Sequence, residues 1–327
     1  MISNADLMLL AVEGGEKARY HAPPNPWVGA LIVGEHGEVI AEGHTQVPGE
    51  AHAEIVVLRR AGERTRGATM IVTLEPCCHV GRTGPCTDAI IASGIRRVIV
   101  GIIDPDPRVA GQGVALLRAS GVDVEVGIEA DVVRAQLAPY LWHRITGRPY
   151  VVAKFASTLD GVVAMADGTS KWITCEAARR DAHVVRAQSQ AIIVGAGTVR
   201  SDDPELTARL DDIVLEPLRV VLGTAPEGAR VRPCLERSGD LGSILDELAQ
   251  HDVIQVLVEG GPTTLSAFFA AGLVNHVVWY QAAAFGGADG TTGALKSLST
   301  STIDQLRRGR LVDVRRIGED IRIDVEV

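Results

Sequence analysis

One short stretch of the chain combines the residue types that bind zinc and activate water. His52 and Glu54 supply an imidazole and a carboxylate, and residues 76–86 supply three thiols. A zinc deaminase needs one His and two Cys as ligands, an open coordination position for water, and a Glu that is not a ligand. Zinc lowers the pKa of the water towards neutrality, and the carboxylate moves the released proton to the leaving amine. This stretch therefore predicts a zinc-dependent deaminase.

The residues around the thiols indicate which of them bind the metal. Cys77 and Cys86 each follow a proline, as the cysteines of the deaminase pattern do, so they are the predicted ligands together with His52. Cys78 and His79, which lie next to Cys77, leave this ligand set open to alternatives. The cluster of His and Cys could also be a structural zinc knuckle, or its cysteines could simply be buried. A closed structural site takes four protein ligands, however, and does not need Glu54 two residues after its His.

Regular elements are predicted to carry these residues. Residues 51–61 have the apolar spacing of a helix, which places His52 and Glu54 on its first turn. Residues 68–74 are an apolar run that predicts a buried strand, and the Glu-Pro that follows ends it. The first thiol then falls at a strand-to-helix junction, and the last opens the next helix after a proline. The partial positive charge of helix N-termini favours the thiolate form there.

The spacing of the thiols distinguishes this chain from simpler deaminases. Eight residues separate Cys77 from Cys86, whereas cytidine and adenosine deaminases place two residues between their cysteines. The loop CCHVGRTGPC resembles that of the bifunctional deaminase–reductases of riboflavin biosynthesis (the RibD/RibG type). The resemblance covers nearly the whole chain. It is carried, in order, by Asn25–Gly29 (NPWVG), Gly67–Pro76 (GATMIVTLEP), Asp104–Pro107 (DPDP), Val109–Gly113 (VAGQG), Lys154–Gly161 (KFASTLDG), Trp172–Thr174 (WIT), Arg186–Gln188 (RAQ), Asp202–Pro204 (DDP) and Glu259–Pro262 (EGGP).

Composition sets bounds on the class of protein. A length of 327 residues suggests about two domains, and 46% hydrophobic residues suffice for their cores. The net charge of −9 and an aromatic content of 4% argue against a nucleic-acid partner or an anionic membrane surface. No apolar run reaches the roughly 18 residues of a membrane span, and no signal peptide is expected. Five cysteines, three of them clustered beside a His, indicate metal in a reducing compartment. We therefore expect a cytoplasmic enzyme. The resemblance implies that its substrates are small pyrimidine ribonucleotides, and a homo-oligomer is left open.

Strand and helix patterns alternate through the first half and predict an α/β domain with a mixed sheet. This agrees with the cytidine-deaminase-like fold that the resemblance implies, and the domain is expected over residues 1–145. The polar, Gly- and Pro-containing segment His143–Pro149 is the predicted linker. The predicted strands are Val28–Val33, Val39–Gly43, Thr69–Leu74, Arg97–Ile103 and Val122–Val126, and the predicted helices lie around residues 4–18, 51–61, 86–93, 110–120 and 129–143.

A second domain is expected over residues 150–327. Two of its turns, 192–198 and 258–265, carry glycines where a strand leads into a helix, and the second offers N–H groups and hydroxyls as a phosphate site. The first turn lacks the third glycine of a dinucleotide fingerprint. Either turn alone would be an ordinary strand-to-helix connection of an α/β protein. The resemblance implies NADPH in a dihydrofolate-reductase-like fold. Strands are predicted from Tyr150, at Ala191–Val194, Leu218–Leu222, Ile254–Glu259 and Val277–Ala282, and near 311–315 and 321–326.

Lys154 lies inside the apolar strand YVVAKFA, where an ammonium group is costly unless it is paired or faces a ligand. Alternation places Val152, Lys154 and Ala156 on one face of this strand. That face is either exposed to solvent, with the lysine extending to the strand edge, or the floor of a polar pocket. In the second case, the substrate that the resemblance implies would have its ribose hydroxyls held by the ammonium, or an alkoxide stabilised by it as the sugar opens.

The resemblance also implies roles for individual residues. Glu54 and Lys154 would be catalytic, and His52, Cys77 and Cys86 would bind zinc. The implied substrate contacts are Asn25, His79, Arg82, Lys154, Ser170, Arg186, Leu206, Arg209 and Glu259. Of these, Arg186 and Arg209 are suited to a ribose phosphate, because a guanidinium group binds phosphate through two hydrogen bonds. The implied cofactor contacts are Ala156, Trp172, Thr174, Thr198, Asp202, Gly261, Pro262, Thr263, Thr264 and Leu265.

The chain departs from the family pattern in a few places. His44 is displaced by one position, which would point it to the other face of a strand and removes a clear reason to expect a ligand contact there. Gly84 replaces a proline of the zinc loop, and two stretches of the second half, after Arg209 and after Val231, are short. The reductase loops are therefore expected to be trimmed.

Two other classes of protein are alternatives to a bifunctional enzyme. A nucleic-acid deaminase predicts a two-residue cysteine spacing and a basic groove, and the sequence has neither. A non-catalytic nucleotide sensor would tolerate loss of Glu54 or Lys154, and both are present. These observations favour an enzyme, and the resemblance implies zinc-dependent deamination followed by NADPH-dependent reduction of a ribosyl side chain to ribityl.

Overall fold

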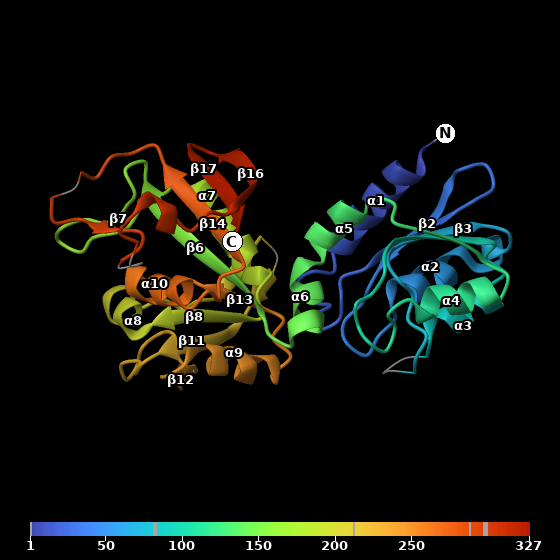
Figure 1. The fold of residues 1–327 in the computed structure, drawn as a ribbon, viewed down its shortest axis with the longest axis horizontal. Coiled ribbons are helices and arrows are strands. Elements are labelled where there is room, and N and C mark those ends of the chain that lie inside the picture. The colour runs from blue at the N-terminus through green and yellow to red at the C-terminus, as the bar shows by residue number, and fades with distance from the viewer. Residues whose placement is uncertain (1, 81–83, 212, 288, 297–299) are drawn as a thin grey trace. The chain divides into compact units, whose positions relative to one another are not determined.

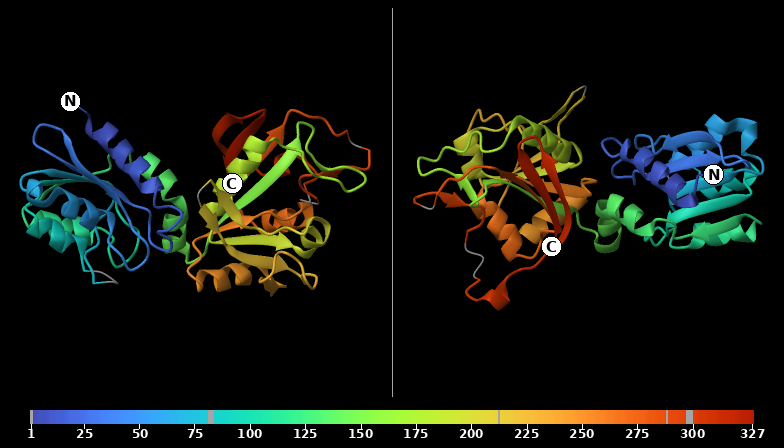
Figure 2. Two further views of the ribbon diagram at one scale, coloured as in Figure 1. Left: turned by 180° about the vertical axis from the view of Figure 1, so that it is seen from behind. Right: turned by 90° about the horizontal axis from the view of Figure 1, so that it is seen from above.

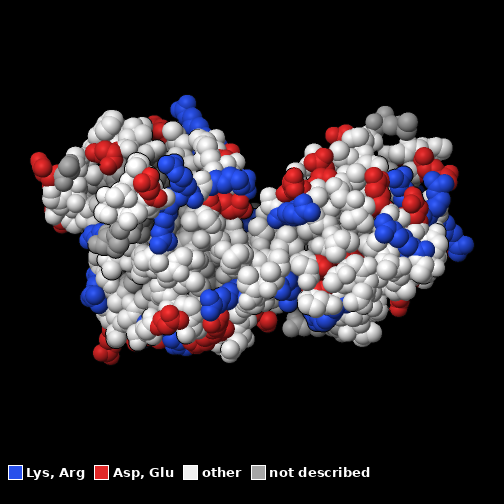
Figure 3. All heavy atoms as spheres, viewed as in Figure 1, with Lys and Arg blue, Asp and Glu red and all other residues white. Residues whose placement is uncertain are grey.

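The computed structural model describes residues 2–80, 84–211, 213–287, 289–296 and 300–327. The chain divides into two compact units, Met1–Gly147 and Arg148–Val327. Each unit has its own helix-covered sheet, the first drawn in blue to green and the second in green to red (Figures 1 and 2). Within the described residues, no helix is long and apolar enough to cross a membrane. Acidic and basic side chains are interspersed on the face of both units drawn in Figure 3.

The sheet of the first unit has the order β2-β1-β3-β4-β5. β1 is antiparallel to both neighbours, whereas β3, β4 and β5 are parallel, which gives the predicted mixed sheet. The carboxyl ends of β3 and β4 therefore lie side by side. The elements in order are α1 (Asn4–Glu16), β1 (Gly29–Val33), β2 (Val39–His44), α2 (Ala53–Ala61), η1 (Gly62–Thr65), β3 (Thr69–Leu74), α3 (Cys86–Ala92), β4 (Arg97–Ile102), α4 (Gln112–Ala119), β5 (Asp123–Val126), α5 (Ala130–Gln136) and α6 (Ala138–Thr146).

Three sequence predictions about this unit need correction. His52 is not on the first turn of α2 but precedes it as the N-cap, with an extended backbone (φ −70°, ψ 163°). The single helix predicted over 129–143 is two helices, α5 and α6, because Pro139 has no N–H to continue a helix but fits the first turn of a new one. The predicted linker from His143 is also too long, since α6 continues to Thr146.

The second unit contains a larger sheet with the order β12-β11-β8-β13-β6-β14-β17-β16. Its strands are parallel from β12 to β14, and β17 and β16 complete it in antiparallel fashion. The elements are β6 (Tyr150–Thr158), β7 (Val162–Ala164), α7 (Glu176–Ala187), β8 (Ala191–Gly195), α8 (Ala196–Asp202), β9 (Ala208–Leu210), β10 (Ile213–Leu215), β11 (Leu218–Leu222), β12 (Leu235–Arg237), α9 (Leu241–Ala249), β13 (Gln255–Val258), α10 (Pro262–Ala270), β14 (His276–Ala282), β15 (Thr292–Gly293), η2 (Ile303–Gln305), β16 (Arg310–Ile317) and β17 (Asp320–Glu326).

One face of β6 packs into the hydrophobic core of this unit. Val151, Ala153 and Phe155 are buried there, together with apolar residues of α9 and α10. Alternation along the strand therefore turns Lys154 and Ala156 to the opposite face. Glu259, predicted as the last residue of the neighbouring strand, directly follows β13.

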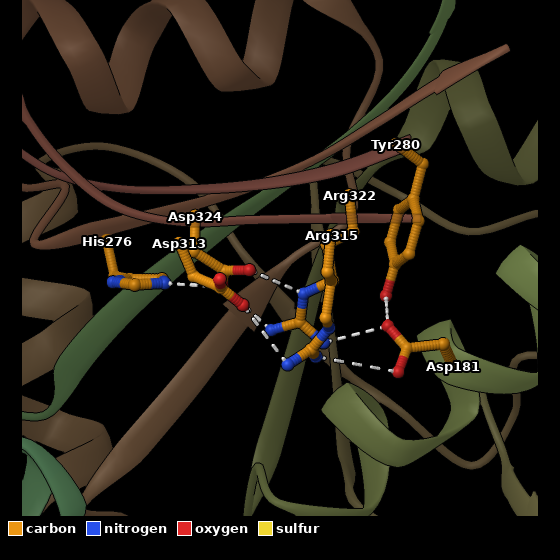
Figure 4. Close-up of polar contacts among 7 residues, drawn as sticks. All are labelled: Asp181, His276, Tyr280, Asp313, Arg315, Arg322 and Asp324. Carbon is orange, nitrogen blue, oxygen red and sulfur yellow. Dashed lines mark hydrogen bonds and ion pairs between the residues drawn. The ribbon is translucent and has the colours of Figure 1, made fainter. Parts of the chain in front are cut away.

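A polar network fixes α7 to the C-terminal strands (Figure 4). Asp181 of α7 accepts hydrogen bonds from the Tyr280 hydroxyl (2.5 Å) and from Arg322 (2.7 Å). Arg322 also forms two 2.7 Å hydrogen bonds with Asp324, whose other partner is His276 at 2.9 Å. Because α7 also carries side chains that line a large cavity described below, this network anchors one wall of that cavity.

The network predicts a specific dependence of stability on acid. Burial alone would raise the pKa of Asp324, but hydrogen bonds from His276 and Arg322 outweigh it and lower the pKa to about 2, against 3.8 for a free Asp. The stability from this carboxylate is therefore complete above about pH 4 and is lost as the pH falls through about 2. We expect Asp324→Asn to reduce the slope of the unfolding free energy against pH in this window. An unchanged slope, measured by denaturant titration, would contradict this assignment.

Candidate active sites

His52, Cys77 and Cys86 converge in the first unit. The Nδ1 atom of His52 lies 3.6 Å from Sγ of Cys77 and 3.4 Å from Sγ of Cys86, and the three ligand atoms all lie within 4.8 Å of one another. Zn–N and Zn–S bonds of about 2.0–2.3 Å at a tetrahedral angle give N···S separations of about 3.5 Å. The donor set therefore fits zinc. Cys78 lies outside this group, and its Sγ donates instead to the carbonyl of Arg108 (3.8 Å).

The fold brings these ligands together at the ends of three elements. His52 caps α2, Cys77 follows β3, and Cys86 begins α3. The backbone N–H of Cys86 donates to Sγ of Cys77 at 3.4 Å. Hydrogen bonds from Cys86 and from His52 lower the pKa of Cys77 to about 4. The lowered pKa favours the thiolate form of Cys77, the form that binds metal, whereas the hydrogen bond to Cys77 and burial raise the pKa of the neighbouring Cys86 thiol.

Glu54 lies on the first turn of α2 beside these residues and is only 4% exposed. Burial raises the pKa of this carboxyl group above its ordinary value, which suits a group that both accepts and returns a proton. Glu54 lines a cavity of about 110 Å³ together with His52, Asn25 and His79. Arg82, which was also predicted for this pocket, lies outside the described residues.

The metal ligands give a direct test. We expect purified protein to contain about one zinc per chain, as one three-residue ligand set implies. Cys86→Ser should lose both zinc and deamination, whereas Cys78→Ser should keep both. Elemental analysis and ammonia release measure the two properties separately. Loss of metal from Cys78→Ser but not from Cys77→Ser would show that the ligand assignment is wrong.

A second, larger cavity of about 1010 Å³ lies in the second unit. Each residue that the resemblance implied for the reductase lines it. The substrate-type residues are Lys154, Ser170, Arg186, Leu206, Arg209 and Glu259, and the cofactor-type residues are Ala156, Trp172, Thr174, Thr198, Asp202, Gly261, Pro262, Thr263, Thr264 and Leu265. The structure thus brings both sets together in one space, and their individual roles remain predictions.

The polar centre of this cavity is a carboxylate between two cations. Glu259, with a side chain 6% exposed, lies 3.3 Å from Nζ of Lys154 and accepts hydrogen bonds from Nε (2.6 Å) and Nη2 (2.8 Å) of Arg186. Burial would raise the pKa of Glu259, but the two cations hold it well below its usual range. Nη1 of Arg186 also donates to the carbonyl of Thr207 (3.2 Å). Arg186 is therefore directed mainly at Glu259, and a phosphate contact by this guanidinium stays a prediction.

The two glycine-containing turns meet at one edge of this cavity. They follow the adjacent parallel strands β8 and β13, as the sequence predicted. The N–H of Gly261, which caps α10, donates to the hydroxyl of Thr198 at 3.1 Å. A Cβ added at Gly195 would lie 2.6 Å from Oγ1 of Thr264, so a larger residue here would displace that side chain. The N-terminus of α10 therefore offers backbone N–H groups suited to the phosphates of a nucleotide.

Sequence reasoning gave no role to several residues that line the two cavities. In the first unit these are Glu75, Asp104, Asp106, Arg108, Tyr140 and Arg144, and in the second they include Lys171, Arg179, His183 and Arg230. Among the quoted motifs, GATMIVTLEP contains Glu75, and DPDP contains Asp104 and Asp106. His44 does not line the small cavity and instead makes an edge contact with the ring of His21 (5.9 Å between centroids).

Comparison with known proteins supports the division of the chain into a deaminase unit and a reductase unit. Residues 1–102 match the cytidine and deoxycytidylate deaminase zinc-binding region, and residues 149–323 match the RibD C-terminal domain. Riboflavin biosynthesis protein RibD of Mycobacterium tuberculosis is 40% identical over 331 residues, covering 98% of this chain and 96% of that protein. A structure of RibD from Acinetobacter baumannii has a TM-score of 0.91 and 36% identity, covering 99% of this chain and 98% of that one.

A third relative carries both activities in its name. The Thermotoga maritima structure of a diaminohydroxyphosphoribosylaminopyrimidine deaminase/5-amino-6-(5-phosphoribosylamino)uracil reductase has a TM-score of 0.87 and 34% identity, covering 99% of this chain and 98% of that one. Fold, sites and relatives together define a zinc-type deaminase joined to a reductase, which confirms the predicted fold classes and the prediction of a two-activity enzyme. The chain belongs to the RibD family of riboflavin biosynthesis.

Proposed function

We propose that this chain carries out two successive steps of riboflavin biosynthesis. Residues 1–145 would remove the 2-amino group of 2,5-diamino-6-(5-phosphoribosylamino)pyrimidin-4-one by hydrolysis. Residues 150–327 would then use NADPH to reduce the ribosyl group of 5-amino-6-(5-phosphoribosylamino)uracil to ribityl. Support comes from the two cavities, which are lined by residue types suited to these two reactions. Further support comes from relatives that are named for RibD or for both activities and that match this chain over nearly their whole length. The thiolate ligands also favour a reducing compartment, the cytoplasm.

In the deaminase, this chain's residues position and move protons. His52, Cys77 and Cys86 would hold zinc, which supplies a Lewis acid and lowers the pKa of water when bound. Glu54 would take a proton from the attacking water and return it to the leaving amino group. Its burial favours this exchange because the raised pKa brings the carboxyl closer to the operating pH. Asn25 would contact the pyrimidine nucleotide from the cavity wall.

In the reductase, the lysine–glutamate–arginine centre would orient the sugar. NADPH would supply the hydride, and the backbone N–H groups at the N-terminus of α10 would hold its phosphates. Glu259 lies 3.3 Å from the ammonium group of Lys154, and Arg186 shares the charge of that carboxylate. The ammonium group of Lys154 would then stabilise negative charge that develops on the sugar oxygen as the ring opens.

The convergence of His52, Cys77 and Cys86 beside the buried Glu54 carries this proposal. The reductase half is tested with purified protein and the pre-formed aminouracil nucleotide. We expect oxidation of one NADPH per substrate, and a higher kcat/KM with NADPH than with NADH. Equal or better use of NADH would contradict the cofactor assignment but leave the reductase class intact.

A further inference from the structure

A buried carboxylate beside the metal ligands takes no part in the chemistry derived above. Glu75 directly follows β3, lies two residues before Cys77, is 4% exposed and lines the deaminase cavity. Its backbone N–H donates to the carbonyl of Ile102, the last residue of β4 (3.0 Å). Glu75 thus stands at the carboxyl ends of two adjacent parallel strands. From β3 the chain continues to Cys77 and Cys86, and from β4 it continues into residues 103–111.

The Glu75 side chain holds the second of these segments through its backbone. Oε2 accepts hydrogen bonds from the N–H groups of Asp104 (3.2 Å) and Gly111 (2.9 Å), and Oε1 accepts one from the N–H of Val114 (3.0 Å). Gly111 is the N-cap of α4 and has no side chain that could accept a hydrogen bond from the first N–H groups of the helix. Glu75 therefore caps α4 from a distant part of the sequence. A carboxylate is favourable there because the first N–H groups of a helix lack partners within the helix.

The segment held in this way forms part of the wall of the deaminase cavity. Asp104, Asp106 and Arg108 line the same cavity as Glu54. Asp104 also accepts a hydrogen bond from the Tyr140 hydroxyl (3.1 Å). Asp106 pairs with Arg108 at 2.6 Å. The position of these side chains therefore depends on where the backbone from 104 to 114 is held.

The packing beneath α4 places this segment against the chain that leads to the metal ligands. A Cβ added at Gly113 would lie 2.1 Å from the carbonyl oxygen of Pro76 and 3.2 Å from Oε1 of Glu75. α4 thus rests directly on the peptide that precedes Cys77. Any displacement of α4 would move the cavity wall relative to the metal ligands.

We propose that Glu75 is a positioning residue of the deaminase. It holds residues 104–114 in a fixed place relative to His52, Cys77 and Cys86. The cavity wall that residues 104–114 form therefore fits the pyrimidine nucleotide. The inference rests on the proposed deamination of such a nucleotide. Because Glu75 acts through the wall and not on the reacting atoms, its loss weakens substrate binding more than the chemical step.

Glu75→Gln tests this directly, because it keeps the shape but replaces one acceptor oxygen with an NH₂ group that faces backbone N–H donors. We expect the KM for the diaminopyrimidine nucleotide to rise about tenfold or more, as misplacement of a binding wall implies, with kcat within about threefold. Zinc content should be unchanged. Hydrogen exchange at the Gly111 and Val114 amides should become faster. Glu75→Asp, which keeps the charge but retracts it by one methylene, serves if the first variant does not fold.

Asp6→Asn is the matched control, because Asp6 accepts a backbone hydrogen bond from Ser3 at the start of α1 in the same unit. This variant should lose stability without any change in KM. A KM within twofold of wild type in both Glu75 variants, or parallel loss of kcat and zinc, would overturn the proposal. Wild-type protein that releases no ammonia would overturn the proposed function instead, and the exchange of the two amides would still decide whether Glu75 holds the segment.

Discussion

Glu54→Gln is expected to abolish ammonia release while leaving reduction of the pre-formed aminouracil nucleotide intact. Glu54 is buried on the first turn of α2 next to the metal ligands, and it is the residue proposed to move the proton between water and leaving group. Removing a general acid–base group costs roughly 10²- to 10⁴-fold in rate. The amide keeps the size and shape of the side chain but cannot carry the proton. Ammonia release and NADPH oxidation, followed in separate assays, measure the two activities.

The two compact units make this separation a strong test. Glu54 lies in the first unit, whereas each residue proposed for the reductase lies in the second. The zinc content of the Glu54→Gln protein should equal that of wild type, since this residue is not a ligand. Equal loss of both activities in a folded, zinc-loaded variant would rule out two separate sites.

Lys154→Met is expected to lower reductase activity by about a hundredfold or more, the scale of losing one preorganised electrostatic contact. Methionine keeps an unbranched stem but removes the ammonium group that lies 3.3 Å from Glu259. Glu259 does not become an unpaired buried charge, because Arg186 still holds it through two hydrogen bonds. The fold should therefore survive, and deamination should be unchanged.

A matched variant distinguishes charge from structure at this centre. Arg186→Met removes the bidentate partner of Glu259 and leaves only Lys154, so it should reduce thermal stability more than Lys154→Met does. Lys154→Arg restores a positive charge with a different shape and should recover only part of the rate. Reduction by Lys154→Met at nearly the wild-type rate would show that this lysine is a structural partner of Glu259 and no more.

The sequence was sufficient for features that are local in the chain. The metal ligands fall within 35 residues and carry a spacing pattern, and the main strands show apolar runs or alternation long enough to locate. Strands of two or three residues, such as β9 and β15, have no such pattern and were not predicted. The helix break near Pro139 was visible in principle, because proline favours the first turn of a new helix.

Long-range pairings were beyond sequence reasoning. Arg186 was assigned to a phosphate from its residue type, whereas its bidentate bond to Glu259 joins residues that are 73 positions apart. The role of Glu75 was missed for a related reason. Its partners are backbone N–H groups, which every residue except proline possesses, so no side-chain pattern marks them.

The central claim is that one chain performs both reactions, and a single coupled assay tests it most directly. Purified wild-type protein is supplied with the diaminopyrimidine nucleotide, with and without NADPH, while ammonia and NADPH are followed together. We predict ammonia release in both cases and, with NADPH present, one NADPH oxidised for each ammonia released after a short lag. Ammonia release without any NADPH oxidation, or NADPH oxidation without ammonia, would contradict the account.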